Sequence, residues 1–181
     1  MLLSAFKALE QLYLQQPLAQ SIRLAGLTIG LHAFAQKRDH RLKLLLTPYA
    51  VVIGLHFLLM GSYPGAISAW ISSIRTWVSR RSNSLKWALS FMVITLILVV
   101  PRITSWVFVL PLLGACLGTW ALFREQGIRM RTMLMLGTVC WLIHNIAIGS
   151  IGGSVIESSF LMMNAATLYR LWQDGGREHI V

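Results

Sequence analysis

Polar residues inside long apolar segments are the first candidates for chemistry in this sequence. Glu157 and Asn164 are seven residues apart and share one helix face, and Arg75 lies in another apolar segment with Ser72 on its face. Such a buried ionisable group normally faces a partner charge or a water-filled space. Two interpretations stay open: a solute or proton site, or an ion pair of Glu157 with Arg75 or Arg23. Arg23 is the easier partner because it lies at a more similar depth.

Two histidines form a second candidate site. His56 and His144 each precede a Gly-Ser pair by five residues, and Asn145 beside His144 is a further candidate solute ligand. Imidazole titrates near neutral pH, so two histidines facing one cavity could take up protons. The alternative is a hydrogen bond from each histidine to a neighbouring helix. Because no cysteine or carboxylate cluster accompanies them, we expect no metal site. The Gly-Ser pairs are Gly61-Ser62 and Gly149-Ser150.

Nothing in the sequence is typical of an enzyme or of a cofactor site. It has no glycine-rich phosphate loop, no nucleophile elbow and no dyad of carboxylates. Cys116 and Cys140 stand in apolar segments without metal-ligand spacing, which is typical of buried free thiols. We therefore expect a non-enzymatic protein without a cofactor.

The residues named above lie in apolar segments that predict an all-α, polytopic membrane protein. Of 181 residues, 56% are hydrophobic and 12% are charged, about half the charged fraction of a soluble domain. The net charge of +10 comes from short basic clusters between apolar segments, which is typical of cytoplasmic loops and not of a nucleic-acid-binding surface. Seven segments of roughly 17–21 residues are predicted to span the membrane: 18–36, 44–61, 64–80, 85–101, 103–123, 132–150 and 153–172.

Charge asymmetry predicts the orientation. Basic residues concentrate in the connections between segments 1 and 2, 3 and 4, and 5 and 6, and at the C-terminal end. The positive-inside rule therefore places the N-terminus outside and the C-terminus in the cytoplasm. The first 17 residues, interrupted by polar side chains, predict a short interfacial helix and not a signal peptide. Twelve basic residues are expected inside: Lys37, Arg38, Arg41, Lys43, Arg80, Arg81, Lys86, Arg124, Arg129, Arg131, Arg170 and Arg177. Three are expected outside: Lys7, Arg23 and Arg102.

An internal repeat relates the two histidine motifs. Residues 24–65 match residues 112–153 without a gap, at an offset of 88, and 11 of the 42 positions are identical. Four Gly pairs, a His pair and an Arg pair in register are not a by-product of apolar composition. The matched pairs are Leu24/Leu112, Gly26/Gly114, Gly30/Gly118, Ala33/Ala121, Arg41/Arg129, Leu46/Leu134, Val51/Val139, His56/His144, Gly61/Gly149, Ser62/Ser150 and Gly65/Gly153, with Lys43/Arg131 as a near-match.

The repeat predicts a 3+1+3 architecture. Two three-helix units can be parallel only when an odd number of spans joins them. We therefore expect one linker helix, at residues 81–102, between units at residues 18–80 and 103–173. The N-terminal segment 1–17 and the C-terminal tail 174–181 lie outside these units. Solutes bind between such repeats in known transporters. Gly26, Gly30, Gly114 and Gly118 predict close helix packing, which could also be a sliding surface. The Gly-Ser pairs predict tight outer turns, with an extracellular gate as the alternative.

The sequence also resembles a known family. The stretches "WLIHNIAIGSIGG" and "YAVVIGLHFLLMGSYPGA", with the surrounding residues 17–173, resemble the YgjV family of bacterial inner membrane proteins. The 3+1+3 plan resembles SWEET and PQ-loop transporters, although their Pro-Gln pair is absent, so the resemblance implies neither a proline hinge nor a sugar. We expect an inner-membrane transporter for a small solute, with proton coupling open. The alternative is a non-transporting membrane protein that binds lipid or a partner, and a homo-oligomer is left open.

Overall fold

The computed structural model describes residues 16–175, and these residues form seven α-helices without a strand. This confirms the prediction of an all-α protein; the predicted interfacial helix of the first residues lies outside the described range. Two short 3-10 turns separate the fourth and fifth α-helices. The helices are α2 (Pro17–Ala35), α3 (Asp39–Leu59), α4 (Tyr63–Ser79), α5 (Leu85–Val99), α6 (Val109–Arg124), α7 (Gly127–Ala147) and α8 (Ile151–Gln173), and the turns are η1 (Val100–Arg102) and η2 (Trp106–Phe108).

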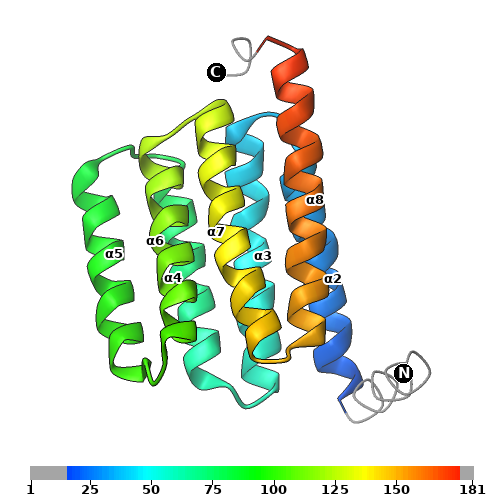
Figure 1. The fold of residues 1–181 in the computed structure, drawn as a ribbon, viewed down its shortest axis with the longest axis vertical. Coiled ribbons are helices and arrows are strands. Elements are labelled where there is room, and N and C mark those ends of the chain that lie inside the picture. Colours follow the sequence, from blue (N-terminus) through cyan, green and yellow to red (C-terminus); the bar gives the residue numbers. More distant parts are fainter. Residues whose placement is uncertain (1–15, 176–181) are drawn as a thin grey trace.

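The helices form two layers (Figure 1). Helices α2, α3 and α4 make one layer and α6, α7 and α8 the other, each with its second helix in the middle. The layers meet along two seams, which we call the α2–α8 seam and the α4–α6 seam. Helix α5 packs on α6 at one edge. In each layer the neighbouring helices are therefore antiparallel. The third helix of one layer lies against the first helix of the other.

Glycine turns end the middle helix of each layer, as predicted. Gly61 follows α3 with φ +74°, and Gly149 follows α7 with φ +72°. Only glycine adopts this left-handed conformation without a steric penalty, so it can stop a helix and start a tight turn. The amide of Ser62 then donates to Phe57 O, and the amide of Ser150 donates to Asn145 O. The two Gly-Ser pairs are therefore turn-forming residues in the structure.

Helices α3 and α7 begin earlier than their apolar segments. They start at Asp39 and Gly127, five residues before the predicted bounds of 44 and 132. Both helices begin with a turn that contains charged side chains and ends in a basic residue, Lys43 or Arg131, and both of these basic residues are buried. A hydropathy pattern assigns such a turn to the connection because of its charges. The starts and ends of the two helices differ by the 88-residue offset of the sequence repeat.

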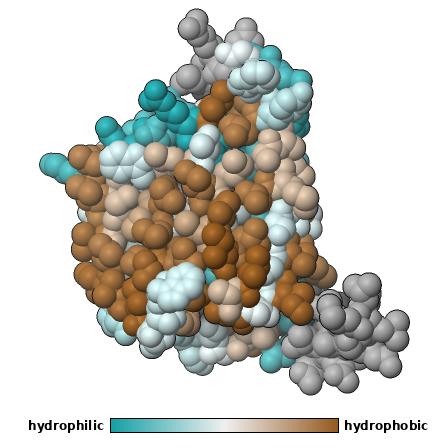
Figure 2. Space-filling model, in the orientation of Figure 1, coloured by the Kyte–Doolittle hydropathy of each residue, from teal (hydrophilic) through white to brown (hydrophobic). Residues whose placement is uncertain are grey.

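The surface exposes many large apolar side chains. On the face that Figure 2 shows, apolar side chains cover the body of the bundle and polar residues gather at one end. Among the described helices, Asp39–Leu59 and Trp106–Arg124 meet both the length and the mean hydropathy of a membrane span, at 1.8 and 1.9, and Leu85–Val99 is apolar but shorter. A monomeric soluble protein rarely exposes apolar surface on this scale.

Packing is densest in one half of the bundle. We call the end with the α2–α3, α4–α5 and α6–α7 connections the basic end, and the end with the α3–α4 and α7–α8 turns the turn end. The main apolar core, which includes Phe34, Leu42 and Leu122, lies toward the basic end. The ten largest fully buried side chains all lie in that half as well: Arg131, Phe123, Leu42, Leu122, Met130, Leu171, Asn164, Thr119, Thr167 and Ser79. The layers are therefore closed against each other at the basic end.

The paired glycines of α6 predict opposite responses to the same substitution. A Cβ at Gly114 would lie 2.9 Å from the backbone O of Gly137 in α7, whereas no atom lies within 4 Å of a Cβ at Gly118. We therefore expect Gly114→Ala to destabilise the protein by about 1–3 kcal/mol through overpacking. Gly118→Ala is the matched control, because it changes the same helix by the same methyl group. Thermal unfolding of the two variants in detergent tests this, and equal midpoints would contradict the close approach of α6 and α7.

Candidate functional site

Two basic side chains cross between the layers at the basic end. Lys43 Nζ of α3 donates to Leu122 O of α6 at 2.6 Å, and to Ser79 O at 3.3 Å. Arg131 of α7 donates to Phe34 O of α2 at 3.4 Å and to Gln36 O at 2.5 Å. Lys43 and Arg131 are 88 residues apart, and so are Phe34 and Leu122. The middle helix of each layer thus caps the first helix of the other layer, and we call these contacts the reciprocal caps.

The reciprocal caps satisfy groups that helix geometry leaves unpaired. The last carbonyls of a helix have no partner within that helix, and burying them without one is costly. Lys43 is only 7% exposed and Arg131 is fully buried, so water does not supply these partners. Asp39 adds a third contact across the layers: its Oδ2 accepts from the amide of Gly127 at 2.6 Å, and its Oδ1 lies 3.9 Å from Arg131 Nε.

Two polar residues of α8 complete the contacts at the basic end. Asn164 Nδ2 donates to Arg131 O at 3.0 Å, and Thr167 Oγ1 donates to Phe34 O at 2.8 Å. Both side chains are buried, and Asn164 Oδ1 has no hydrogen-bond partner. Asn164, predicted from the sequence as a solute ligand beside Glu157, therefore binds the backbone next to the reciprocal caps.

Glu157 lies in the same seam toward the turn end. Within residues 16–175 its carboxylate forms no ion pair and no hydrogen bond, so the two counter-ions allowed by the sequence, Arg75 and Arg23, are not bonded to it. Tyr49 of α3 is within electrostatic range of both Glu157 and Arg23, and its ring packs edge-on against Phe160 of α8 at 5.6 Å. The seam therefore holds a carboxyl, a phenol and a guanidinium contributed by three helices.

Arg75 lies in the opposite seam. Its Nη1 donates to Thr119 Oγ1 at 2.9 Å and to Ala115 O at 3.3 Å, which ties α4 to α6. Its Nε is buried without a hydrogen-bond partner, and none of the ion pairs among the described residues includes it. Ser72, one turn earlier on α4, is half-buried. The structure therefore separates Arg75 and Ser72 from Glu157 and places them in different seams.

Each histidine is bonded within its own layer. His56 Nδ1 lies 2.9 Å from Ala19 O of α2, and His144 Nδ1 lies 3.0 Å from Val107 O of η2. Both imidazoles are buried. The acceptors are again 88 residues apart. This geometry is that of a hydrogen bond to a neighbouring segment, the alternative that the sequence left open, and the two rings bind separate carbonyls.

Other residues of the turn end have packing contacts. Asn145 Oδ1 lies 2.4 Å from where a Cβ of Gly153 would be, so Asn145 contacts the first turn of α8. Ser150 Oγ accepts from the amide of Gly153, while Ser62 forms no side-chain cap. Cβ atoms at Gly26 and Gly30 would contact the side chains of Ile53 and Phe160, as expected for close helix packing.

Sequence reasoning missed Tyr49, Lys43 and Arg131 as site residues. The sequence pattern places Lys43 and Arg131 among the charges of cytoplasmic loops, although their match at the 88-residue offset is a usable signal. Tyr49 carried no signal, because its counterpart at the offset is Gly137. Among residues 16–175, no group of three histidine, cysteine or acidic side chains lies close enough to bind a metal.

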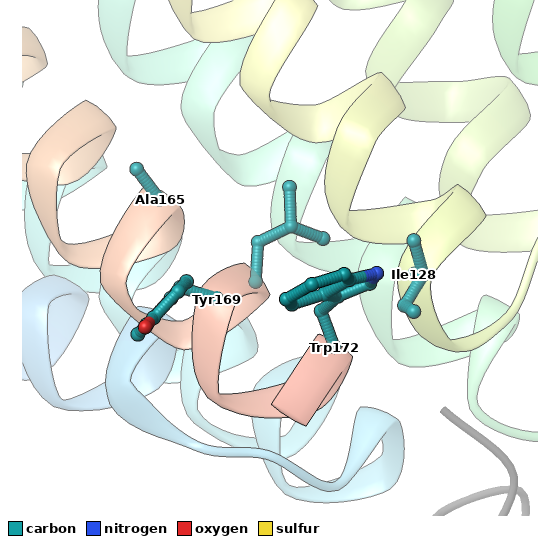
Figure 3. A pocket seen from close by; sticks show the side chains of 5 residues that line it. Ile128, Ala165, Tyr169 and Trp172 are labelled. Carbon is teal, nitrogen blue, oxygen red and sulfur yellow. The ribbon is translucent and has the colours of Figure 1, made fainter. Parts of the chain in front are cut away.

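One open groove of about 340 Å³ lies on the outside of the second layer, near the basic end. Figure 3 shows Trp172 of α8 pointing toward Ile128 of α7, with Tyr169 and Ala165 along α8. Leu168 completes the lining, which is almost entirely apolar. None of the polar residues discussed above lines this groove.

The fold and its surface define a helical membrane protein, and comparison with known proteins gives the family. Residues 17–175 match the model of a family described as bacterial inner membrane protein, Imp-YgjV. The chain is also 40% identical over 157 residues to inner membrane protein YgjV of Escherichia coli (strain K12). This matched region covers 86% of this chain and 85% of that protein. The chain therefore belongs to the YgjV family, and it is an inner membrane protein. No solved structure matches it, so the architectural resemblance to SWEET and PQ-loop transporters has no support from a known structure.

Proposed function

We propose that this protein is a small-solute transporter that opens and closes the seams between its two layers. The observation that carries the proposal is the unequal packing of the two halves of the bundle. At the basic end the layers are joined by the reciprocal caps and by the main apolar core. Toward the turn end the α2–α8 seam contains half-buried Glu157, which has no bonded partner among residues 16–175. Such a difference is what a transporter closed on one side requires.

A seven-span topology is part of the proposal. The axes of the seven helices of residues 16–175 run side by side (Figure 1), and apolar side chains cover the body of the bundle on the face that Figure 2 shows. The basic residues of the α2–α3, α4–α5 and α6–α7 connections lie at one end, which the positive-inside rule assigns to the cytoplasm. On this topology the N-terminus is outside, the C-terminus is inside, and the reciprocal caps close the cytoplasmic side.

A duplicated three-helix unit supports the mechanism. Three sets of hydrogen bonds recur at an offset of 88 residues: the histidine contacts, the turn contacts after Gly61 and Gly149, and the reciprocal caps. The reciprocal caps are notable because each runs from one unit to the other, as expected for two units related by a twofold axis along the helices. Two equivalent units with α5 as linker could rock against each other about an axis perpendicular to the helices. Membrane transporters built from parallel repeats have this design.

Flux through reconstituted protein tests the proposal. Purified protein in liposomes is expected to release at least one radiolabelled solute, from a set of sugars, amino acids, nucleosides, polyamines and monocarboxylates, faster than empty liposomes do, with a rate that saturates. Saturation distinguishes a binding site from a leak. Release at the rate of empty liposomes for every solute would contradict the proposal.

The apolar groove favours a second candidate function, lipid binding without transport. It is open to the surface, it lies near the basic end, and Trp172 and Tyr169 beside it are residue types enriched at membrane interfaces. An acyl chain matches its almost entirely apolar lining. Retention of a defined phospholipid through purification, lost in Trp172→Ala, together with absence of flux for every solute, would support this function over transport.

A further inference from the structure

We propose that the α4–α6 seam is a binding site for a small monocarboxylate, with Arg75 as the residue that binds its carboxylate. The α4–α6 seam and the α2–α8 seam occupy equivalent positions in the two-layer fold, and they differ in what fills them. The proposal deepens the proposed transport function by naming the chemical class of the solute. The binding itself does not depend on transport.

Comparison of the two seams at the 88-residue offset shows that large side chains have been replaced by small and polar ones. In the α2–α8 seam, Phe160 belongs to the main apolar core and its neighbours pack against it. A Cβ at Gly30 would meet Phe160 at 2.6 Å and Tyr49 at 3.1 Å, so that seam is full. In each pair that follows, the first residue belongs to the α2–α8 seam and the second is its counterpart in the α4–α6 seam: Leu27/Ala115, Leu31/Thr119, Tyr49/Gly137, Phe160/Ser72 and Met163/Arg75.

The replacement leaves open space beside Gly118. Gly118 is buried, yet no atom lies within 4 Å of the position of its Cβ. Its counterpart Gly30 faces a phenylalanine and a tyrosine, and those two positions are occupied by Ser72 and Gly137 in this seam. The space is therefore the volume that an aromatic pair fills in the other seam.

Arg75 supplies a charge that the protein itself does not neutralise. Its guanidinium donates only to the neutral acceptors Thr119 Oγ1 and Ala115 O. Its Nε is buried without a partner, and it belongs to none of the ion pairs within the described part of the chain. A guanidinium within a membrane protein binds an anion most favourably through two parallel N–H donors, which match the geometry of a carboxylate. One positive charge matches one negative charge, so a monocarboxylate is favoured over a dianion.

Cys116 gives the site a natural reporter. Its thiol is half-buried and within electrostatic range of Arg75. In a Cys140→Ala background, acetate, lactate and benzoate are the probes, with acetamide, lactamide and benzamide as uncharged controls of the same shape. We expect at least one carboxylate to raise Tm in detergent and to slow alkylation of Cys116 by N-ethylmaleimide, and its amide to do neither.

Two variants separate binding from folding. Arg75→Gln is expected to lose both responses to the carboxylate. Gly118→Leu is expected to fold, because open space receives the side chain, and to lose both responses because that space is filled. Gly30→Leu, the matched change in the full seam, is expected to lower Tm without a carboxylate present. The proposal is overturned if no carboxylate raises Tm, or if the response survives in Gly118→Leu. A carboxylate that binds without any flux in liposomes would contradict the transport proposal alone.

Discussion

Glu157→Gln is expected to reduce solute flux in liposomes to the rate of empty liposomes, while the protein is still expressed and folds. Glutamine keeps the size of the side chain but cannot carry its negative charge. Glu157 is the acidic residue of the α2–α8 seam, it is half-buried, and no ion pair among residues 16–175 includes it. In apolar surroundings a carboxyl can bind and release a proton during transport, which the amide of glutamine cannot do.

Glu125→Gln is the matched control for this substitution. Glu125 Oε1 accepts from Trp120 Nε1 at 3.1 Å at the basic end, and an amide oxygen can accept the same hydrogen bond. We expect its flux to equal that of the unmodified protein. Flux that is unchanged in Glu157→Gln would remove Glu157 from the transport mechanism, whereas loss of flux in both variants would show an effect on the fold.

Arg131→Met is expected to give the largest loss of stability among single substitutions at the basic end. The change removes the donors to Phe34 O and Gln36 O, and it takes from half-buried Asp39 its fully buried ion-pair partner. Removing one partner of a buried charge pair costs about 3–5 kcal/mol. Thermal unfolding in detergent, with the midpoint compared to that of the unmodified protein, measures the loss.

Arg131→Lys tests whether the reciprocal caps or the bulk of the side chain are responsible. The equivalent residue of the first layer is a lysine that caps a carbonyl with one nitrogen, so we expect Arg131→Lys to recover much of the stability. The double variant Lys43→Arg/Arg131→Lys exchanges the two basic residues between the layers. We expect its unfolding midpoint to be close to that of the unmodified protein. A midpoint for Arg131→Lys as low as that of Arg131→Met would show that charge at this position does not hold the layers together.

Much of the fold could be predicted from sequence because helix ends carry strong local signals. The glycines at 61 and 149 adopt the predicted left-handed conformation, and each of the seven predicted apolar segments overlaps with one of the seven α-helices of residues 16–175. The starts of α3 and α7 were wrong by one turn. The cause is physical: residues 39–43 and 127–131 carry charged side chains, and Lys43 and Arg131 among them are buried by bonds to carbonyls far away in the sequence.

The arrangement of the polar residues could be predicted only in part. Sequence spacing showed that Glu157 and Asn164 share a face of one helix, but the partner of Asn164 is a backbone oxygen of α7. Likewise Arg75 and Glu157 belong to the third helices of the two units. The sequence of neither helix indicates that Arg75 lies in the α4–α6 seam and Glu157 in the α2–α8 seam. Such contacts depend on which helix of one layer lies against which helix of the other, and hydropathy carries no information about that choice.

The distance between the two layers at each end of the bundle tests the central claim most directly. Spin labels at Arg41→Cys and Arg129→Cys report the basic end, and labels at Met60→Cys and Ile148→Cys report the turn end; all four positions are exposed. Each pair is studied by double electron–electron resonance in a background without Cys116 and Cys140, with and without Arg131→Met.

Arg131→Met removes one of the two reciprocal caps. This loss is predicted to lengthen the distance between the two labels at the basic end and to shorten the distance between the two labels at the turn end in the same protein. This opposite change is what rocking of two three-helix units about a common axis requires. Unchanged distances at both ends in a folded Arg131→Met variant, or lengthening at both ends together, would contradict the account.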